Sequence, residues 1–206
     1  MKNIYYIGGS PCSGKSTIAQ ILSAKYNLYY FKADDYLEQY AKSGALKGYE
    51  ICRKQCSMSA EEIWMREPVL QCEEELMFYR EIFEFIQKEL RRLADMQHGS
   101  ILTEGAAYLP ELMEKINISK NRYLSIIPSS EFQVSHYRKR EWISSVLEGC
   151  QDKEAAFSNW MKRDIMFAKE VQKQCERGNF KYIINDGSMR TDELARKAAA
   201  YFGLRY

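Results

Sequence analysis

The 206-residue sequence lacks a long apolar run and lacks a strong charge of either sign. A membrane-spanning helix needs about 18 or more consecutive apolar residues, and no stretch approaches that length. The 30 basic and 28 acidic residues leave a formal net charge of +2, so a basic site for an anion must be local. The stretch before Gly8 is too short for a signal peptide, and we expect a cytoplasmic protein.

The cysteines and histidines lack the spacing of metal ligands. No CxxC pair occurs among the six cysteines, and His98 and His136 are distant in sequence from the pair Cys52 and Cys56. Zinc ligands usually show tighter spacing. Reduced thiols are therefore the favoured interpretation, and a zinc site is the less favoured one.

Five short apolar segments alternate with helical segments along the chain. Each is followed by Gly, Pro or Asp, or contains such a residue at its end. The expected strands are residues 2–7, 28–33, 100–106, 121–127 and 180–185. Short apolar strands that alternate with helices indicate a parallel sheet with both faces covered. The sequence therefore predicts an α/β fold.

The interval between the second and third expected strands is too long for a simple crossover. Over residues 69–94 apolar side chains recur every three or four positions, which predicts a long helix. The run Glu73-Glu74-Glu75 is interpreted as the solvated face of that helix. Ser59 and Glu62 have the spacing of a capping box. We expect residues 37–98 to form an all-helical insert over one end of the sheet.

A second helical block is expected over residues 129–177. Ser130 and Gln133 have capping-box spacing at its start. Residues 149–153 (GCQDK) interrupt the helical pattern and predict a flexible break.

Residues 9–16 fit the phosphate-binding pattern G-x-x-x-x-G-K-[ST] in full. Small residues let successive backbone N–H groups turn inward around a phosphate. Lys15 supplies positive charge to the β- and γ-phosphates, and the Ser16 hydroxyl is a ligand for Mg²⁺. A strand before and a helix after are the context that the pattern requires, so the sequence predicts a site for ATP and Mg²⁺. The residues expected to bind the nucleotide are Gly9, Ser10, Pro11, Cys12, Ser13, Gly14, Lys15, Ser16 and Thr17.

Four features make the chain similar to the P-loop kinases of small molecules and nucleotides, such as the adenylate, shikimate and gluconate kinases and chloramphenicol phosphotransferase. The P-loop follows the first strand, and the acids Asp34 and Asp35 follow the second. A helical insert comes next, and an arginine-bearing helical segment follows the fourth strand. The resemblance covers the whole chain in outline, but only the P-loop is specific in its residues.

The resemblance implies a three-layer core with a five-stranded parallel sheet in the order 2-3-1-4-5. It assigns residues 1–36 and 99–206 to the nucleotide-binding core, and residues 37–98 to an insert that grips the phosphoryl acceptor. It further implies a helical lid over about residues 129–163. The chain lacks the N-K-x-D motif of switch GTPases. It also lacks the D-G-x-P-R sequence of nucleoside-monophosphate kinases after the third strand, which disfavours a nucleoside monophosphate as the acceptor.

Acidic candidates stand at the carboxyl ends of two strands, where ligands bind in open α/β sheets. Asp34 can accept the proton of the acceptor hydroxyl or bind Mg²⁺ through water. As an alternative, Asp34 or Asp35 caps the following helix; both are also candidates for contact with the acceptor. Glu104 is expected to hold Mg²⁺ or to act as the base, and the alternative is a solvated strand end.

Arginines are the expected charge clamps. Arg140 and Arg163 are predicted to stabilise the transferring phosphoryl group, as catalytic residues beside Lys15 and Asp34. Arg66 and Arg80, in the insert, are candidates for holding an anionic acceptor.

The sequence therefore predicts an ATP- and Mg²⁺-dependent phosphotransferase. Its acceptor is expected to be a small hydroxylated or phosphorylated metabolite, a nucleoside or an antibiotic. One alternative is a 5′-hydroxyl polynucleotide kinase, which the near-neutral charge disfavours. Another is a module that binds or hydrolyses ATP without an acceptor. Neither a nucleic-acid partner nor a membrane is expected, and the oligomeric state is left open.

Overall fold

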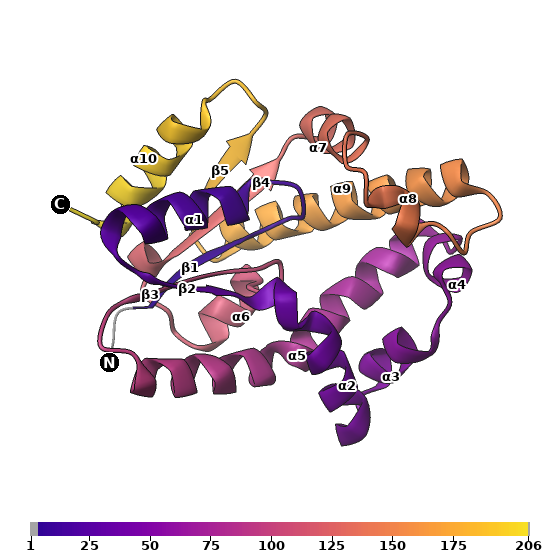
Figure 1. The fold of residues 1–206 in the computed structure, drawn as a ribbon, viewed down its shortest axis with the longest axis horizontal. Coiled ribbons are helices and arrows are strands. Elements are labelled where there is room, and N and C mark those ends of the chain that lie inside the picture. The colour runs from indigo at the N-terminus through magenta and orange to yellow at the C-terminus, as the bar shows by residue number, and fades with distance from the viewer. Residues whose placement is uncertain (1–3, 206) are drawn as a thin grey trace.

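The computed structural model describes residues 4–205, which form a parallel sheet between two layers of helices (Figure 1). The strands are β1 (Ile4–Gly9), β2 (Tyr29–Lys32), β3 (Ile101–Glu104), β4 (Tyr123–Pro128) and β5 (Lys181–Asn185). Their order is β2-β3-β1-β4-β5, and all the pairs are parallel. The α/β class and the strand order are therefore confirmed; residues 2 and 3 of the first expected strand lie outside the described part.

Two apolar cores cover the two faces of the sheet. On one face, α1 (Lys15–Tyr26) and α10 (Thr191–Phe202) pack over side chains such as Ile7 and Leu124. On the other face lie α5 (Pro68–Met96), α6 (Pro110–Lys115) and α9 (Lys153–Arg177). Adjacent side chains of a strand point to opposite faces, so each nearly uniformly apolar strand supplies both cores.

The helices between β2 and β3 begin with a short 3-10 helix, η1 (Ala33–Tyr36), which follows directly on β2. Next come α2 (Leu37–Lys47), α3 (Glu50–Ser57), α4 (Ala60–Trp64) and α5. The capping box at Ser59 and Glu62 is confirmed, as is the buried face of the long helix. α5 contacts α2, α3 and α9, and its buried side chains join the core on this face of the sheet (Figure 1).

After β3 the chain forms α6, a short 3-10 helix η2 (Lys120–Arg122) and β4. The second helical block then consists of α7 (Ser130–Tyr137), α8 (Ile143–Val146) and α9, and the predicted break precedes α9. The capping box expected at Ser130 and Gln133 is wrong. Ser129 is the N-cap, because its hydroxyl accepts a 3.2 Å hydrogen bond from the Phe132 N–H.

Within residues 4–205, the helices do not combine the length and apolar character that crossing a bilayer requires.

Candidate functional site

The P-loop joins the end of β1 to the start of α1. Gly9 has a φ of +123°, and a Cβ at this position would overlap the backbone of Ile126 in β4. Only glycine fits both constraints. Cys12 also has a positive φ, of 62°, a conformation that costs free energy in a non-glycine residue and is concentrated at ligand sites. The P-loop therefore contains an unfavourable backbone conformation at Cys12.

Side chains from distant elements hold the P-loop in place. The Asn185 amide, at the end of β5, donates a 2.9 Å hydrogen bond to the Ser13 carbonyl. The Gln133 amide of α7 is fully buried and donates a 3.3 Å hydrogen bond to the Pro11 carbonyl. The P-loop motif identifies neither residue. Both satisfy carbonyl groups of the loop and fix its course. The first N–H groups of a helix have no partner within the helix, so those of α1 are suited to an anion.

Lys15 lies at the start of α1, with only 5% of its surface exposed. Its Nζ donates a 2.8 Å hydrogen bond to the Ser10 carbonyl. The ammonium therefore lies within the loop itself. A phosphate bound there would meet both this charge and the positive end of the helix dipole. Ser16 follows on the same helix turn.

A pocket of about 410 Å³ opens beside the P-loop, on the side of α7 and α10. Arg140 lines it together with Thr17 and Asn185. Phe132 and His136 of α7 also face it, with their rings stacked at 3.8 Å between centroids. The remaining lining residues are Cys12, Gly14, Ile18, Gly187, Met189, Arg190, Thr191 and Leu194. This pocket adjoins the phosphate-binding loop directly.

Asp34 lies in η1, and its Oδ1 accepts a 3.1 Å hydrogen bond from the Ala106 N–H. It fits closely against Gly105, since a Cβ there would stand 2.8 Å from Oδ1. Burial, reinforced by the charge of Glu104 and opposed by that of Lys15, raises the pKa of Asp34 to about 6. This value suits a group that exchanges a proton near neutral pH.

Asp35 differs from its neighbour because its side chain is exposed and forms an ion pair with Lys32. The two carboxylates therefore occupy different environments. Of the two, the enclosed Asp34 has the surroundings of a functional acid.

Glu104, at the end of β3, is completely buried. Its Oε1 accepts a 3.0 Å hydrogen bond from the Tyr30 hydroxyl, whereas its Oε2 has no hydrogen-bond partner among the described residues. A buried carboxylate oxygen without a partner is costly unless a ligand satisfies it. Mg²⁺ usually takes one or two protein oxygens and completes its shell with phosphates and water. The unpartnered Oε2 of Glu104 is an oxygen of the kind that such a site uses.

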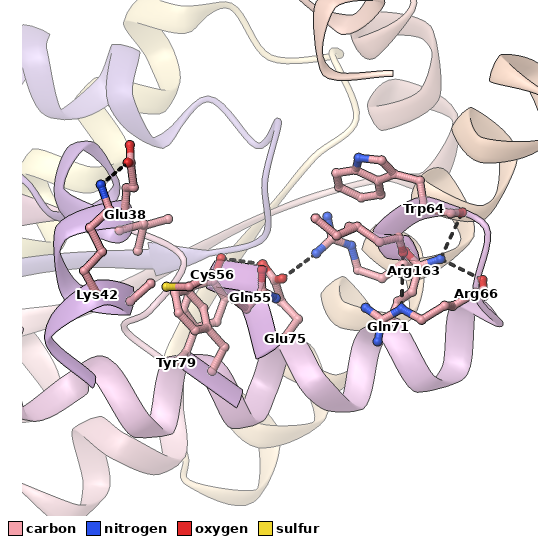
Figure 2. A pocket seen from close by; sticks show the side chains of 14 residues that line it. Glu38, Lys42, Gln55, Cys56, Trp64, Arg66, Gln71, Glu75, Tyr79 and Arg163 are labelled. Atoms are coloured by element: carbon pink, nitrogen blue, oxygen red, sulfur yellow. Dashed lines mark hydrogen bonds and ion pairs between the residues drawn. The ribbon is translucent and has the colours of Figure 1, made fainter. Parts of the chain in front are cut away.

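A second pocket, of about 500 Å³, lies between α2, α3, α4, α5 and α9 (Figure 2). Arg66 and Arg163 both line it. Arg80 does not: its side chain forms an exposed 2.7 Å ion pair with Glu111. The other lining residues are Leu37, Glu38, Ala41, Lys42, Gln55, Cys56, Ile63, Trp64, Gln71, Glu75, Phe78 and Tyr79.

Arg163 projects from α9 between two carboxylates. Its guanidinium lies 2.6 Å from Glu75 of α5 and 2.6 Å from Asp164. Glu75 also accepts a 2.6 Å hydrogen bond from the Tyr79 hydroxyl, and Figure 2 shows this chain of contacts along the pocket wall. Burial, opposed by the charge of Arg163, raises the pKa of Asp164 to about 6.

The interpretation of Glu73-Glu74-Glu75 as a solvated face is wrong for two of the three residues. Glu73 is exposed, but Glu74 is buried and pairs with Lys54 and Arg66. Glu75 pairs with Arg163. The turn of α5 that carries these acids faces α3 and α9. The spacing of apolar residues within α5 cannot predict which other helices pack against that turn.

The segment expected to form a lid has a small apolar core of its own. Tyr137, Leu147, Phe157 and Met161 are among its buried residues. Trp160 of α9 stacks on Trp64 of α4, with 4.3 Å between ring centroids. The segment therefore meets the insert above the second pocket. It places Arg140 in the pocket beside the P-loop and Arg163 in the other one.

The two pockets are connected to the P-loop in different ways. One contains P-loop residues directly. The other reaches the loop through α9: Arg163 lines the pocket, and the next residue, Asp164, accepts a 3.5 Å hydrogen bond from the Ser10 hydroxyl through its carbonyl.

Known proteins that resemble this chain are found among solved structures. No protein-family model and no curated protein matches the chain. Among solved structures, a protein from Thermus thermophilus is 17% identical, with a TM-score of 0.57 over 100% of this chain and 99% of that one. An uncharacterized protein from Eubacterium ventriosum is 18% identical, with a TM-score of 0.51 over 100% of both chains. Shikimate kinase from Aquifex aeolicus is 17% identical, with a TM-score of 0.46 over 97% of this chain and 96% of its own.

Identities of this size describe a shared fold. The chain has the five-stranded parallel sheet, in the order β2-β3-β1-β4-β5, that the resemblance to P-loop kinases implies. That resemblance is therefore confirmed at the level of the fold.

Proposed function

We propose that the protein is an ATP- and Mg²⁺-dependent phosphotransferase whose acceptor is a small hydroxylated metabolite. The observation that carries the proposal is a pair of pockets, one of about 410 Å³ that is lined by P-loop residues and one of about 500 Å³ that is linked to the loop through α9. A module that only binds or hydrolyses ATP has no need for the second pocket. Two substrates that meet at one phosphate-binding loop are what direct group transfer requires.

In this proposal ATP occupies the pocket beside the P-loop. Backbone N–H groups within residues 9–17, other than at Pro11, and the Lys15 ammonium hold the β- and γ-phosphates. Arg140 contacts the nucleotide from the turn between α7 and α8. Ser16 and Glu104 hold Mg²⁺, which supplies positive charge against the phosphates.

The acceptor occupies the pocket lined by α2 to α5 and by Arg163. Its hydroxyl gives its proton to Asp34, and the oxygen forms a bond to the γ-phosphorus as the bond between that phosphorus and the β,γ-bridging oxygen breaks. The products are a phosphate ester, ADP and a protonated Asp34. Arg163 lines this pocket but stays paired with Glu75 and Asp164, so Lys15 and Arg140 supply the positive charge that stabilises the transferring group.

ATP with Mg²⁺ is expected to raise the melting temperature of the protein, because a ligand that binds only the folded state stabilises it by mass action. At 100 times the dissociation constant the gain is about 2.7 kcal/mol. The measurement is thermal unfolding with and without millimolar ATP and Mg²⁺, with Lys15→Ala as the control that should lose most of the shift. Equal melting temperatures with and without ATP, and also with GTP, would contradict a nucleotide site.

A further inference from the structure

The charges of the acceptor pocket restrict the chemistry of the acceptor. Resting on the function proposed above, we propose that this pocket takes an uncharged hydroxyl compound with a partly apolar body, and that it disfavours phosphorylated or carboxylated acceptors. The sequence alone left hydroxylated and phosphorylated metabolites equally open.

Three cationic side chains line the pocket, and each is already paired with a carboxylate. Lys42 lies 2.6 Å from Glu38. Arg66 is hydrogen-bonded to Glu74, and Arg163 lies between Glu75 and Asp164. An acceptor that brought a phosphate or a carboxylate would find no unpaired cation among the described lining residues.

The two arginine pairs are enclosed, which makes them difficult to open. Exposed fractions are 9% for the Arg163 side chain, 16% for Glu75 and 1% for Asp164. Arg66 and Glu74 are 18% and 8% exposed. Separating such a pair would leave a poorly solvated charge, at a high free-energy cost. The Lys42–Glu38 pair is exposed and at the rim, where a charge contributes little to binding.

Glu75 has the position to select against anions. Both of its carboxylate oxygens are engaged, one by the Tyr79 hydroxyl and the other by Arg163, and the residue lines the pocket (Figure 2). An anionic group beside it would meet like-charge repulsion in a weakly solvated space. A neutral hydroxyl instead can donate to a lone pair of this carboxylate.

Apolar side chains supply much of the remaining wall. They come from α2, α4 and α5 and suit a ligand body without charge; they are Leu37, Ala41, Ile63, Trp64 and Phe78.

The test compares benzyl alcohol with benzyl phosphate, a matched pair that differs in charge at one end. Binding is followed by tryptophan fluorescence, because Trp64 lines the pocket. A saturating non-hydrolysable ATP analogue with Mg²⁺ fills the β- and γ-phosphate positions and so keeps the phosphate ester out of the P-loop. We expect the alcohol to bind the wild-type protein more tightly than the phosphate ester.

Glu75→Gln removes one of the two carboxylates from Arg163 while keeping groups that can hydrogen-bond to Tyr79. Its affinity for benzyl phosphate is expected to rise about tenfold or more relative to the wild type. Glu73→Gln makes the same change of charge on the exposed face of α5, and should leave the affinity unchanged. The inference would be overturned if the wild type bound benzyl phosphate more tightly than benzyl alcohol. It would also be overturned if the wild type and Glu75→Gln bound benzyl phosphate with equal affinity.

The wild-type comparison decides the question even if Glu75→Gln fails to fold. Failure of the proposed function gives a separate signal, since ADP and ATP would then produce no thermal shift. In that case the same pair of probes is measured without nucleotide.

Discussion

Lys15→Ala is expected to lower phosphoryl transfer by ~10²–10³-fold, the usual loss when a preorganised positive group is removed from a developing negative charge. The fold should persist, because the side chain belongs to none of the three apolar clusters of the described residues, and its Nζ contacts the Ser10 carbonyl of the same loop. The measurement is kcat, together with the melting temperature of the variant without ligand.

The matched control for this change is Lys25→Ala, in an exposed position of the same helix. It removes an equal charge from α1 at the end remote from the P-loop. The control should retain wild-type turnover. Wild-type turnover in Lys15→Ala would refute the proposed role of the loop.

Asp34→Asn is expected to reduce turnover by ~10²–10⁴-fold, because the amide is nearly the same shape but cannot accept the proton. ATP affinity should change little. In the wild type, activity should fall as the pH is lowered through about 6, where the raised pKa of Asp34 leaves the carboxylate protonated. Asp35→Asn, at the exposed neighbour, serves as the control. Full activity in Asp34→Asn would assign the base elsewhere, with Glu104 the next candidate.

Asp34→Asn should also stabilise the folded protein at pH 8. The pKa of Asp34 is raised in the folded state, so the native protein binds this proton more tightly than the unfolded chain does. Above pH 6 the ionised Asp34 carboxylate therefore lowers the free energy of unfolding. This destabilisation disappears as the pH falls below about 4. A shift of this size corresponds to at most about 3 kcal/mol. Thermal unfolding of both proteins at pH 8 and pH 4 measures it; an Asp34→Asn variant that is less stable at pH 8 would contradict the burial argument.

The local features of the fold could be predicted from the sequence. The glycines and Lys15 identify the P-loop because phosphate binding there depends on the backbone of consecutive residues. Apolar runs identify the strands, and regular apolar spacing identifies α5. The order of the strands followed from the resemblance to a known class of proteins and not from the pattern itself.

The part that sequence reasoning missed depends on contacts between distant segments. Glu75 and Arg163 meet because α5 and α9 pack side by side, and the sequence of either helix alone contains no signal for the pair. Gln133 and Asn185 reach the P-loop from α7 and β5 in the same way. Arg140 and Arg163 had the same predicted role, but the turn of the lid segment places them in different pockets. Buried polar residues such as Asp164 become recognisable only when their partners are known.

Transfer of the γ-phosphoryl group to an acceptor other than water distinguishes a kinase from an ATPase, and labelled ATP measures this transfer. The protein is incubated with ATP labelled in the γ-phosphate, Mg²⁺ and a pool of uncharged hydroxylated metabolites, and the label is followed into organic phosphate esters and inorganic phosphate. For a phosphotransferase, we expect the pool to accelerate ATP consumption, the label to appear in an ester, and Lys15→Ala to abolish both. Label that appears only as inorganic phosphate, at a rate that the pool does not change, would contradict the proposed function.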